Sequence, residues 1–418
     1  MNYINEKWCS ILKNMILICL LIAFLGASFN WSSARKIVYF CSVIAFFILL
    51  FSQHKIKKMD FLLPFSIFIF GGGVLLWIWL FGSWGGQYYS YQSLAKITIA
   101  SSILMCLYST EYFSCILSKK PIQNLLCMIW FFLVGAILIV SCYQYFYLHI
   151  GRAAVGSSIA TMAAYIVSIA GLLGIAFAQR KNDTKWSILF LVVLFIVVYT
   201  SILLTETRSV ILGFPLLFAI AVLAYKDKIH MKQLFCLMSM LIVILMLLLY
   251  TFGDRVQGRM NDIVVDIHKY TQQQNTESSF GARIAMFHAG SEAGKHGFMG
   301  QSIEDRASVI KQYVNQYPVY AGVLPYVYTN LHNEIIENFS LRGVWGVALL
   351  LFLYFSVVCT AIKQRNSILL AIGLSFMIYG LTDVIFSDDL PLSYYIAIIF
   401  VLCLHNNKFA KEKQPSIC

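Results

Sequence analysis

Long apolar runs constrain the fold of this chain more than any other feature. A bilayer core about 30 Å thick is crossed by a helix of about 20 apolar residues, because each residue adds about 1.5 Å. About twelve runs approach that length, near residues 15–30, 37–52, 61–82, 95–114, 124–148, 153–178, 186–205, 209–225, 234–252, 344–362, 367–386 and 391–405. Since 60% of the residues are hydrophobic and only 12% are charged, we expect an all-α polytopic membrane protein.

The basic residues predict how these spans are oriented. A net charge of +12 in a soluble protein would indicate a nucleic-acid partner, but here 18 of the 31 Lys and Arg residues fall in the termini and in alternate short loops. Such residues concentrate on the cytoplasmic side of membrane proteins. We therefore expect both termini in the cytoplasm, lipid around the spans and no nucleic-acid partner, although Arg35 and Lys36 in the first hairpin run against the pattern.

This orientation divides the chain into three parts. Transmembrane helices 1 to 9 would occupy residues 1–252, a large periplasmic loop domain residues 253–342, and the last three spans with a cytoplasmic tail residues 343–418. None of the eleven cysteines falls in the periplasmic part, so no disulfide is expected there.

The periplasmic part carries signals for short amphipathic helices. Apolar residues recur at helical spacing within 256–267 and 309–314, which indicates helices rather than irregular loop. Ser278 or Ser279 is suited to cap one helix, and Ser302 another. The tyrosines of "YVNQYPVYAGVLPYVYTN" are compatible with an interfacial aromatic belt or with stacking platforms for sugar rings.

The stretch "TNLHNEIIENFSLRGVWG" precedes a long apolar run and holds the first candidate site. Asn330 is a suitable helix cap, and at 100° per residue His332 would then share a helix face with Gly343, while Gly346 lies about 40° away. A capping histidine above a glycine packing face is the structural alternative. The functional interpretation is that His332 acts as a general base at the water interface.

Arginines predicted on the same side of the membrane form a second candidate group. Arg208 stands in "LLTETRSV", a short break between two apolar runs, and Arg283 stands in "SSFGARIAMFHAG". Two guanidiniums would suit a pyrophosphate, since each is a planar fork of donors with a permanent charge. Arg152 in "HIGRAAVGSS" is a third candidate. The alternative for all three arginines is contact with phospholipid phosphates. The sequence contains no motif for binding a metal or a nucleotide.

Taken together, these residues resemble the O-antigen ligases of Gram-negative bacteria. That family carries a histidine followed by Asn, Ser or Gln, then nine residues and G-x-x-G, which here are His332, Asn333, Gly343 and Gly346. The chain also resembles the family in its large, late periplasmic loop. Two of its arginines, Arg208 and Arg283, match the family's essential pair in position. The stretch "GLTDVIFS", which contains Asp383, also looks like the family.

The resemblance implies a glycosyltransferase at the periplasmic face of the inner membrane. It would move O-antigen from undecaprenyl pyrophosphate to a sugar hydroxyl of lipid A-core, inverting the anomeric carbon, with no metal, ATP or other cofactor. His332 would be the base, and Arg208 and Arg283 would stabilise the departing pyrophosphate.

Six further residues are expected to contact substrate, namely Arg152, Asn333, Glu337, Gly343, Gly346 and Asp383. Glu337 would orient a neighbouring arginine or bind the acceptor, and Asp383, in an apolar run, requires a partner such as an arginine. An O-antigen polymerase or a protein O-oligosaccharyltransferase of the same superfamily would share this chemistry. A transporter or flippase is the alternative of a different class, but charged residues inside the spans and repeated halves are not found.

Overall fold

The computed structural model describes residues 11–12, 15–16, 18–20, 22–23, 33–51, 61–108, 120–155, 157, 159–178, 184–223, 230–273 and 276–385. Within these ranges every regular element is helical, so the all-α prediction is confirmed there. The predicted span at 391–405, much of that at 15–30 and both chain ends lie outside the described residues.

The helices follow the predicted apolar runs closely. The apolar helices are α2 (Ala34–Phe51), α3 (Leu62–Phe81), α4 (Tyr89–Tyr108), α6 (Lys120–Cys142), α7 (Ala160–Ala178), α8 (Thr184–Thr205), α9 (Arg208–Val222), α10 (Met231–Thr251), α14 (Glu334–Lys363) and α15 (Ser367–Gly380). Among the described residues, five helices are long and apolar enough to cross a membrane, and three shorter apolar helices accompany them. The total of about twelve spans stays a prediction.

Between α10 and α14 the chain forms a more polar group of helices. These are α11 (Gly253–Gln273), α12 (Ser279–His296), α13 (Ile303–Gln316) and the 3-10 segment η5 (Pro318–Tyr326). The Ser278 hydroxyl accepts a hydrogen bond from the Gly281 N–H, and the Ser302 hydroxyl accepts one from the Asp305 N–H. Both predicted helix caps are thus confirmed. Whether this group faces the periplasm stays a prediction.

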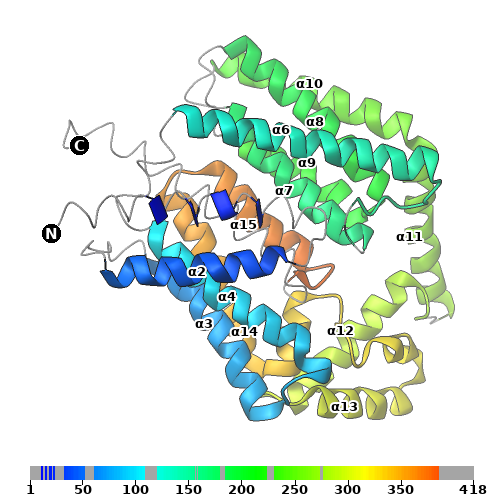
Figure 1. The fold of residues 1–418 in the computed structure, drawn as a ribbon. Helices are drawn as coiled ribbons and strands as arrows, with labels where there is room; N and C mark the ends of the chain where they lie inside the picture. The colour runs from blue at the N-terminus through cyan, green and yellow to red at the C-terminus, as the bar shows by residue number, and fades with distance from the viewer. Residues whose placement is uncertain are drawn as a thin grey trace.

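Figure 1 shows how the helices are arranged around the site. Helices α2, α3 and α4 pack together with α14, helices α6 to α10 form a second group, and α15 lies between the two. Helices α12 and α13 with η5 enclose a small hydrophobic core of their own, which includes Ala285, Ala289, Ile310 and Val323. The polar domain is therefore a packed unit at one side of the helical bundle.

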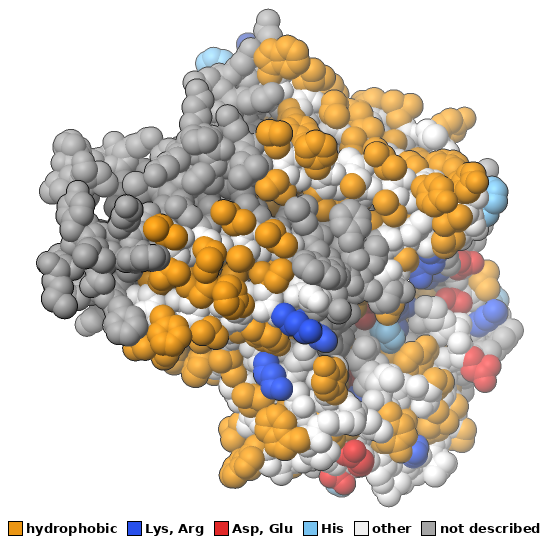
Figure 2. Space-filling view, in the orientation of Figure 1, with side chains coloured by type: hydrophobic (Ala, Val, Ile, Leu, Met, Phe, Trp, Pro, Cys, Tyr) orange, Lys and Arg blue, Asp and Glu red, His pale blue; other side chains and the backbone are white. Residues whose placement is uncertain are grey.

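The surface agrees with a membrane environment for the bundle. Trp79, Phe132 and Phe235 lie on α3, α6 and α10 and are 72%, 75% and 75% exposed. An apolar surface of this kind is unfavourable in water and favourable in lipid. In Figure 2 hydrophobic side chains cover much of the bundle, whereas the acidic side chains in view gather over the region of α11, α12 and α13.

Candidate functional site

His332 lies just before α14, in a strained backbone conformation. Its φ of 47° is in the left-handed region, which non-glycine residues rarely adopt. The predicted cap at Asn330 is wrong. Asn333 caps α14 instead, because its side-chain oxygen accepts hydrogen bonds from the Ile335 and Ile336 N–H groups, whereas Asn330 accepts from the His332 N–H. His332 is therefore outside the helix and does not share a helical face with Gly343.

Asp383 is the partner of the His332 ring. It follows α15 in the chain, and its Oδ1 lies 3.0 Å from His332 Nδ1. An ionised carboxylate only accepts hydrogen bonds, so this contact assigns a proton to Nδ1, and the neutral form of the ring then has its lone pair on Nε2. The His332 side chain is 32% exposed and the Asp383 side chain 12%. A reactant can thus reach the imidazole while the carboxylate stays largely shielded.

The surroundings keep Asp383 ionised. Burial raises the pKa of this carboxyl, but the hydrogen bond and charge of His332, the Val384 N–H and the charge of Arg283 outweigh burial and hold the pKa below its ordinary value. Asp383 Oδ2 also accepts a hydrogen bond from the Tyr165 hydroxyl at 3.3 Å. Asp383 is therefore a fixed negative charge beside His332.

The two predicted arginines approach the same region from different helices. Arg283, on the first turns of α12, is exposed, donates to Ser279 and contributes its charge to Asp383. Arg208 begins α9 and forms an ion pair with Asp262 of α11 at 3.3 Å. The next residue, Ser209, lies against the Tyr165 hydroxyl. Tyr165 thus links the start of α9 to Asp383.

Arg152, predicted to contact substrate, forms hydrogen bonds with the turn before Arg208. Its guanidinium donates to the Thr205 carbonyl at 3.1 Å and to the Thr207 hydroxyl at 3.3 Å. The predicted break between the two apolar runs is confirmed, since α8 ends at Thr205 and α9 begins at Arg208. Glu206 in this turn has a φ of 52°, so the bonds from Arg152 hold a strained connection.

Asn333 connects the segment that carries His332 to the turn that carries Asp383. While its oxygen caps α14, its Nδ2 donates to the Leu381 carbonyl at 2.9 Å. Leu381 lies two residues before Asp383 in the chain. One side chain therefore fixes the separation between the segment that carries His332 and the segment that carries Asp383.

Glu337, predicted to orient an arginine or bind the acceptor, is buried with Arg306 of α13. The two side chains are 1% and 0% exposed, with Oε1 and Nη1 3.0 Å apart. Arg306 also donates to the carbonyls of Val327 and Thr329, and Glu337 Oε2 accepts from the Leu331 N–H. The pair holds the backbone that leads into His332, and its burial leaves Glu337 no surface for a substrate.

The two glycines of the motif make close backbone packing possible. Gly343 kinks α14 with a φ of 65°, and a Cβ there would collide with the Phe298 carbonyl oxygen. The loop between α12 and α13 is bonded to this kink, since the Val344 N–H donates to the Phe298 carbonyl and the Gln301 N–H to the Leu341 carbonyl. Gly346 is buried one turn later. Gly343 thus seats the polar domain on α14, whereas a Cβ at Gly346 would meet the Arg342 side chain of the same helix.

Arg306 and Tyr165 belong to this arrangement but were not predicted. Arg306 stands in the charged stretch "IEDRASVI", which is typical of a solvated face. Its spacing from Ile303, Ile310 and Val314 is nevertheless that of one helical face, and all four are buried. This periodicity was the available signal for Arg306. Tyr165 lies within an apolar run, and no sequence pattern distinguishes it from the core residues around it.

In the described ranges no group of three or more His, Cys, Asp or Glu residues is placed to hold a metal ion.

Comparison with known proteins places this geometry in a family context. A family model described as O-antigen ligase matches residues 199–351, a range that contains Arg208, Arg283 and His332. An O-antigen ligase of Escherichia coli (strain K12) is 32% identical over 362 residues, which cover 85% of this chain and 84% of that protein. An uncharacterised protein of Haemophilus influenzae (strain ATCC 51907 / DSM 11121 / KW20 / Rd) is 24% identical over 193 residues, 45% of this chain and 46% of that protein.

Proposed function

The chain belongs to the O-antigen ligase family, and from this premise we propose that it transfers O-antigen from undecaprenyl pyrophosphate to a sugar hydroxyl of lipid A-core. Family membership makes it a glycosyl-transferring membrane enzyme of lipopolysaccharide biosynthesis. The reaction takes place at the periplasmic face of the inner membrane.

The contact between His332 and Asp383 is the observation that carries the mechanism. With its Nδ1 proton directed to Asp383 at 3.0 Å, His332 presents Nε2 to the acceptor hydroxyl and removes its proton as the new glycosidic bond forms. The carboxylate orients the ring and stabilises the imidazolium that results. Asp383 acts here through His332 rather than by touching the sugar.

Arg208 and Arg283 bind the pyrophosphate leaving group. The bond from the anomeric carbon to the pyrophosphate oxygen breaks, and its electron pair stays on the pyrophosphate. Guanidiniums stabilise that growing charge because they keep their own charge and offer paired donors. Arg208 exchanges Asp262, and Arg283 exchanges Ser279, for phosphate oxygens. Attack from the face opposite the leaving group inverts the anomeric carbon.

The donor bond is already activated, so the reaction needs neither nucleotide nor metal. Membrane lipids surround the spans, and both substrates reach the site from the bilayer surface. Arg152 and Asn333 serve this site by fixing the turn before Arg208 and the spacing between His332 and Asp383. Gly343 serves it by seating the polar domain on α14, and Gly346 by leaving room for the Arg342 side chain one turn earlier.

Reconstitution tests the proposal directly. The purified protein is placed in vesicles with undecaprenyl pyrophosphate-linked O-antigen and lipid A-core, in EDTA and without nucleotide, and the joined product is followed on a gel. We expect product from the wild type and a rate about a hundred to ten thousand times lower for His332→Ala. Absence of wild-type product, or undiminished product from the variant, contradicts the proposal.

The O-antigen polymerase of the same superfamily is the second candidate. The identity to an E. coli protein named O-antigen ligase over most of both chains favours the ligase. Deletion of the gene separates the two. A ligase deletion leaves core-only lipopolysaccharide while lipid-linked polymer accumulates, whereas a polymerase deletion removes the long lipid-linked polymer itself.

A further inference from the structure

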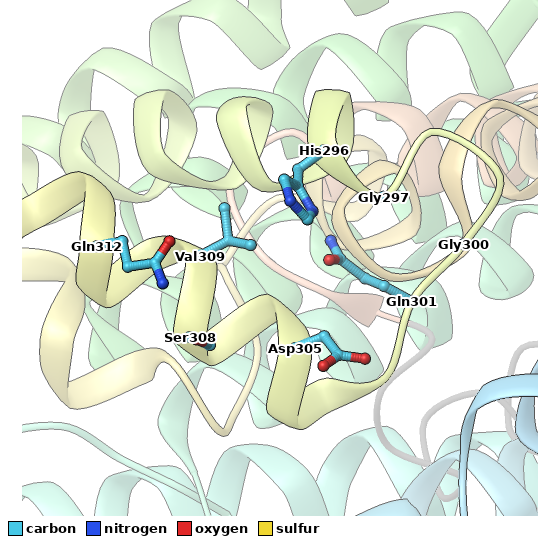
Figure 3. Close-up of a pocket in the computed structure, with 8 residues that line it drawn as sticks. All are labelled: His296, Gly297, Gly300, Gln301, Asp305, Ser308, Val309 and Gln312. Atoms are coloured by element: carbon cyan, nitrogen blue, oxygen red, sulfur yellow. The ribbon is translucent and has the colours of Figure 1, made fainter.

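A polar cavity of about 330 Å³ lies in the α12–α13 domain, apart from the cluster around His332. Its walls come from the end of α12, the connecting loop and the first turns of α13. Figure 3 shows His296, Gln301 and Gln312 converging on it from these three segments. Asp305 and Ser308 also line it. The lining is rich in hydrogen-bonding groups and contains no arginine or lysine.

Gln301 places an unsatisfied acceptor in this cavity. The residue is 5% exposed, and its Nε2 donates to the carbonyls of Ala293 and Ser340, each at 2.7 Å. These two bonds fix the orientation of the amide. Among the described residues, the buried Oε1 of Gln301 has no hydrogen-bond partner. Buried acceptors are nearly always satisfied, so Oε1 is a polar atom of the cavity wall whose partner no described protein group supplies.

A ladder of aromatic rings adjoins the cavity. The rings of His288 and Tyr320 stack with centroids 4.9 Å apart, those of Tyr320 and Tyr313 stack at 5.5 Å, and Tyr317 lies 5.0 Å from Tyr313. Tyr317 at the end of the ladder is 51% exposed. Rings of this kind offer apolar faces to the C–H face of a sugar, with hydroxyls at their edges.

The ladder and the cavity are continuous along two helices. On α13, Val309 lines the cavity, and Tyr313, one turn later on the same helix face, belongs to the ladder. On α12, His288 and His296 are eight residues apart in the sequence, roughly 12 Å along the axis. The opposite end of η5 reaches the site already described, because the Tyr326 ring packs edge-on against His332 at 5.3 Å.

We infer that the cavity and the ladder form one carbohydrate-binding groove, which holds a few sugar units while the reacting end of the chain lies at His332. The amide and hydroxyl groups of the lining suit sugar hydroxyls, the half-exposed Tyr317 ring suits an apolar sugar face, and the Asp305 carboxylate disfavours an anionic ligand. This inference rests on the proposed function, which supplies two sources for the bound sugar chain: the donor polymer and the acceptor core.

Direct binding tests the groove without requiring transfer. The full chain, in nanodiscs free of sugar-based detergent, is titrated with two lipid-free probes, the O-antigen polysaccharide and the core oligosaccharide released by mild acid from lipopolysaccharide of the source bacterium. Saturation-transfer NMR and calorimetry report binding. We expect at least one probe to bind, and the probe that binds identifies the source of the chain.

Matched variants locate the binding. Gln312→Ala and Tyr317→Ala should each weaken binding about tenfold, the scale of one lost hydrogen bond or stacking contact. Gln316→Ala, an exposed glutamine on the same helix but outside the cavity, and Tyr328→Ala, a tyrosine held by Lys311 outside the ladder, should bind as the wild type does.

Three outcomes overturn the inference: no binding of either probe, equal binding by all variants, and equal loss in the controls. The same titration with His332→Ala keeps the two proposals distinct. Binding by this variant together with failure of wild-type transfer contradicts only the proposed function. Transfer by the wild type without the expected loss of binding in Gln312→Ala and Tyr317→Ala contradicts only the groove.

Discussion

At the scale of single residues, hydrogen bonds made by a few side chains decide the state of the site. Asp383 is held ionised against the effect of its burial by His332, the Val384 N–H and the charge of Arg283. His332 in turn is held outside α14 because Asn333, rather than Asn330, caps the helix. The Asp383 carboxylate opposite Nδ1 therefore fixes which tautomer the neutral ring adopts.

The lowered pKa of Asp383 predicts how its contribution to stability depends on pH. A carboxyl whose folded pKa lies below the ordinary 3.8 stabilises the fold fully above that ordinary value, and the contribution is lost as the pH falls through the folded pKa. We expect Asp383→Asn to cost about 2 kcal/mol near neutral pH, since the bond to His332 is a charged one. The difference from the wild type should shrink in acid below pH about 4.

Unfolding in mixed micelles, followed by tryptophan fluorescence across pH, measures this difference. Asp266→Asn on α11 controls for the removal of one negative charge from the polar domain. A difference between wild type and Asp383→Asn that grows as the pH falls below about 4 would contradict the assignment of Asp383 as the ionised partner.

At the scale of the elements, buried contacts fasten the polar helices to the bundle. Arg306 of α13 and Glu337 of α14 form an ion pair without exposed surface, and the Tyr91 hydroxyl of α4 donates to the same carboxylate. Two arginine donors go to backbone carbonyls just before His332. The loop that carries the histidine is thus positioned by three helices at once.

A double-mutant cycle on this pair tests the contact. Removing one partner leaves the other charge buried and unpaired, so Arg306→Met and Glu337→Leu should each lower the free energy of unfolding by about 3–5 kcal/mol. The double variant leaves no unpaired charge in the pair, and its cost should be well below the sum of the two single costs. Additive costs in the micelle unfolding assay would show that the two side chains do not interact.

The kink at Gly343 gives a second prediction at this scale. Alanine there must adopt a φ of 65° and collide with the Phe298 carbonyl, so Gly343→Ala should destabilise the fold by at least about 1–3 kcal/mol. Gly72→Ala in α3, where a Cβ meets nothing within 4 Å, should be neutral or slightly stabilising because alanine favours helix. Equal thermal unfolding midpoints for the two variants would contradict the role of the kink.

At the scale of the whole molecule, an apolar bundle carries a polar domain on one side. Most of the exposed aromatic and aliphatic side chains lie on the bundle helices, while the acidic side chains in view gather over α11, α12 and α13 (Figure 2). Arg208, Arg283, His332 and Asp383 lie at the ends of α9, α12, α14 and α15 where bundle and domain meet. Such a boundary suits the proposed reaction, because a lipid-anchored substrate and a water-exposed group can meet there.

Labelling from either side of the membrane tests the orientation. In a cysteine-free background, Lys269→Cys on α11 should react with an impermeant maleimide in intact spheroplasts, because the polar domain is predicted to be periplasmic. Arg365→Cys, in the short loop between α14 and α15, should react only after permeabilisation. The reverse pattern would place the site on the cytoplasmic side.

The amino-acid sequence alone predicted the all-helical class, most helix positions, two caps of the polar domain, the break before Arg208 and the residues of the family motif. Helical periodicity, capping and apolar length are local properties, so they can be deduced from neighbouring residues. The tertiary structure decided which side chains meet: His332 with Asp383 across 51 positions of the sequence, Arg306 with Glu337, and the loop at Phe298 against Gly343. Those contacts join segments far apart in the chain, and only packing in three dimensions fixes their distances and burial.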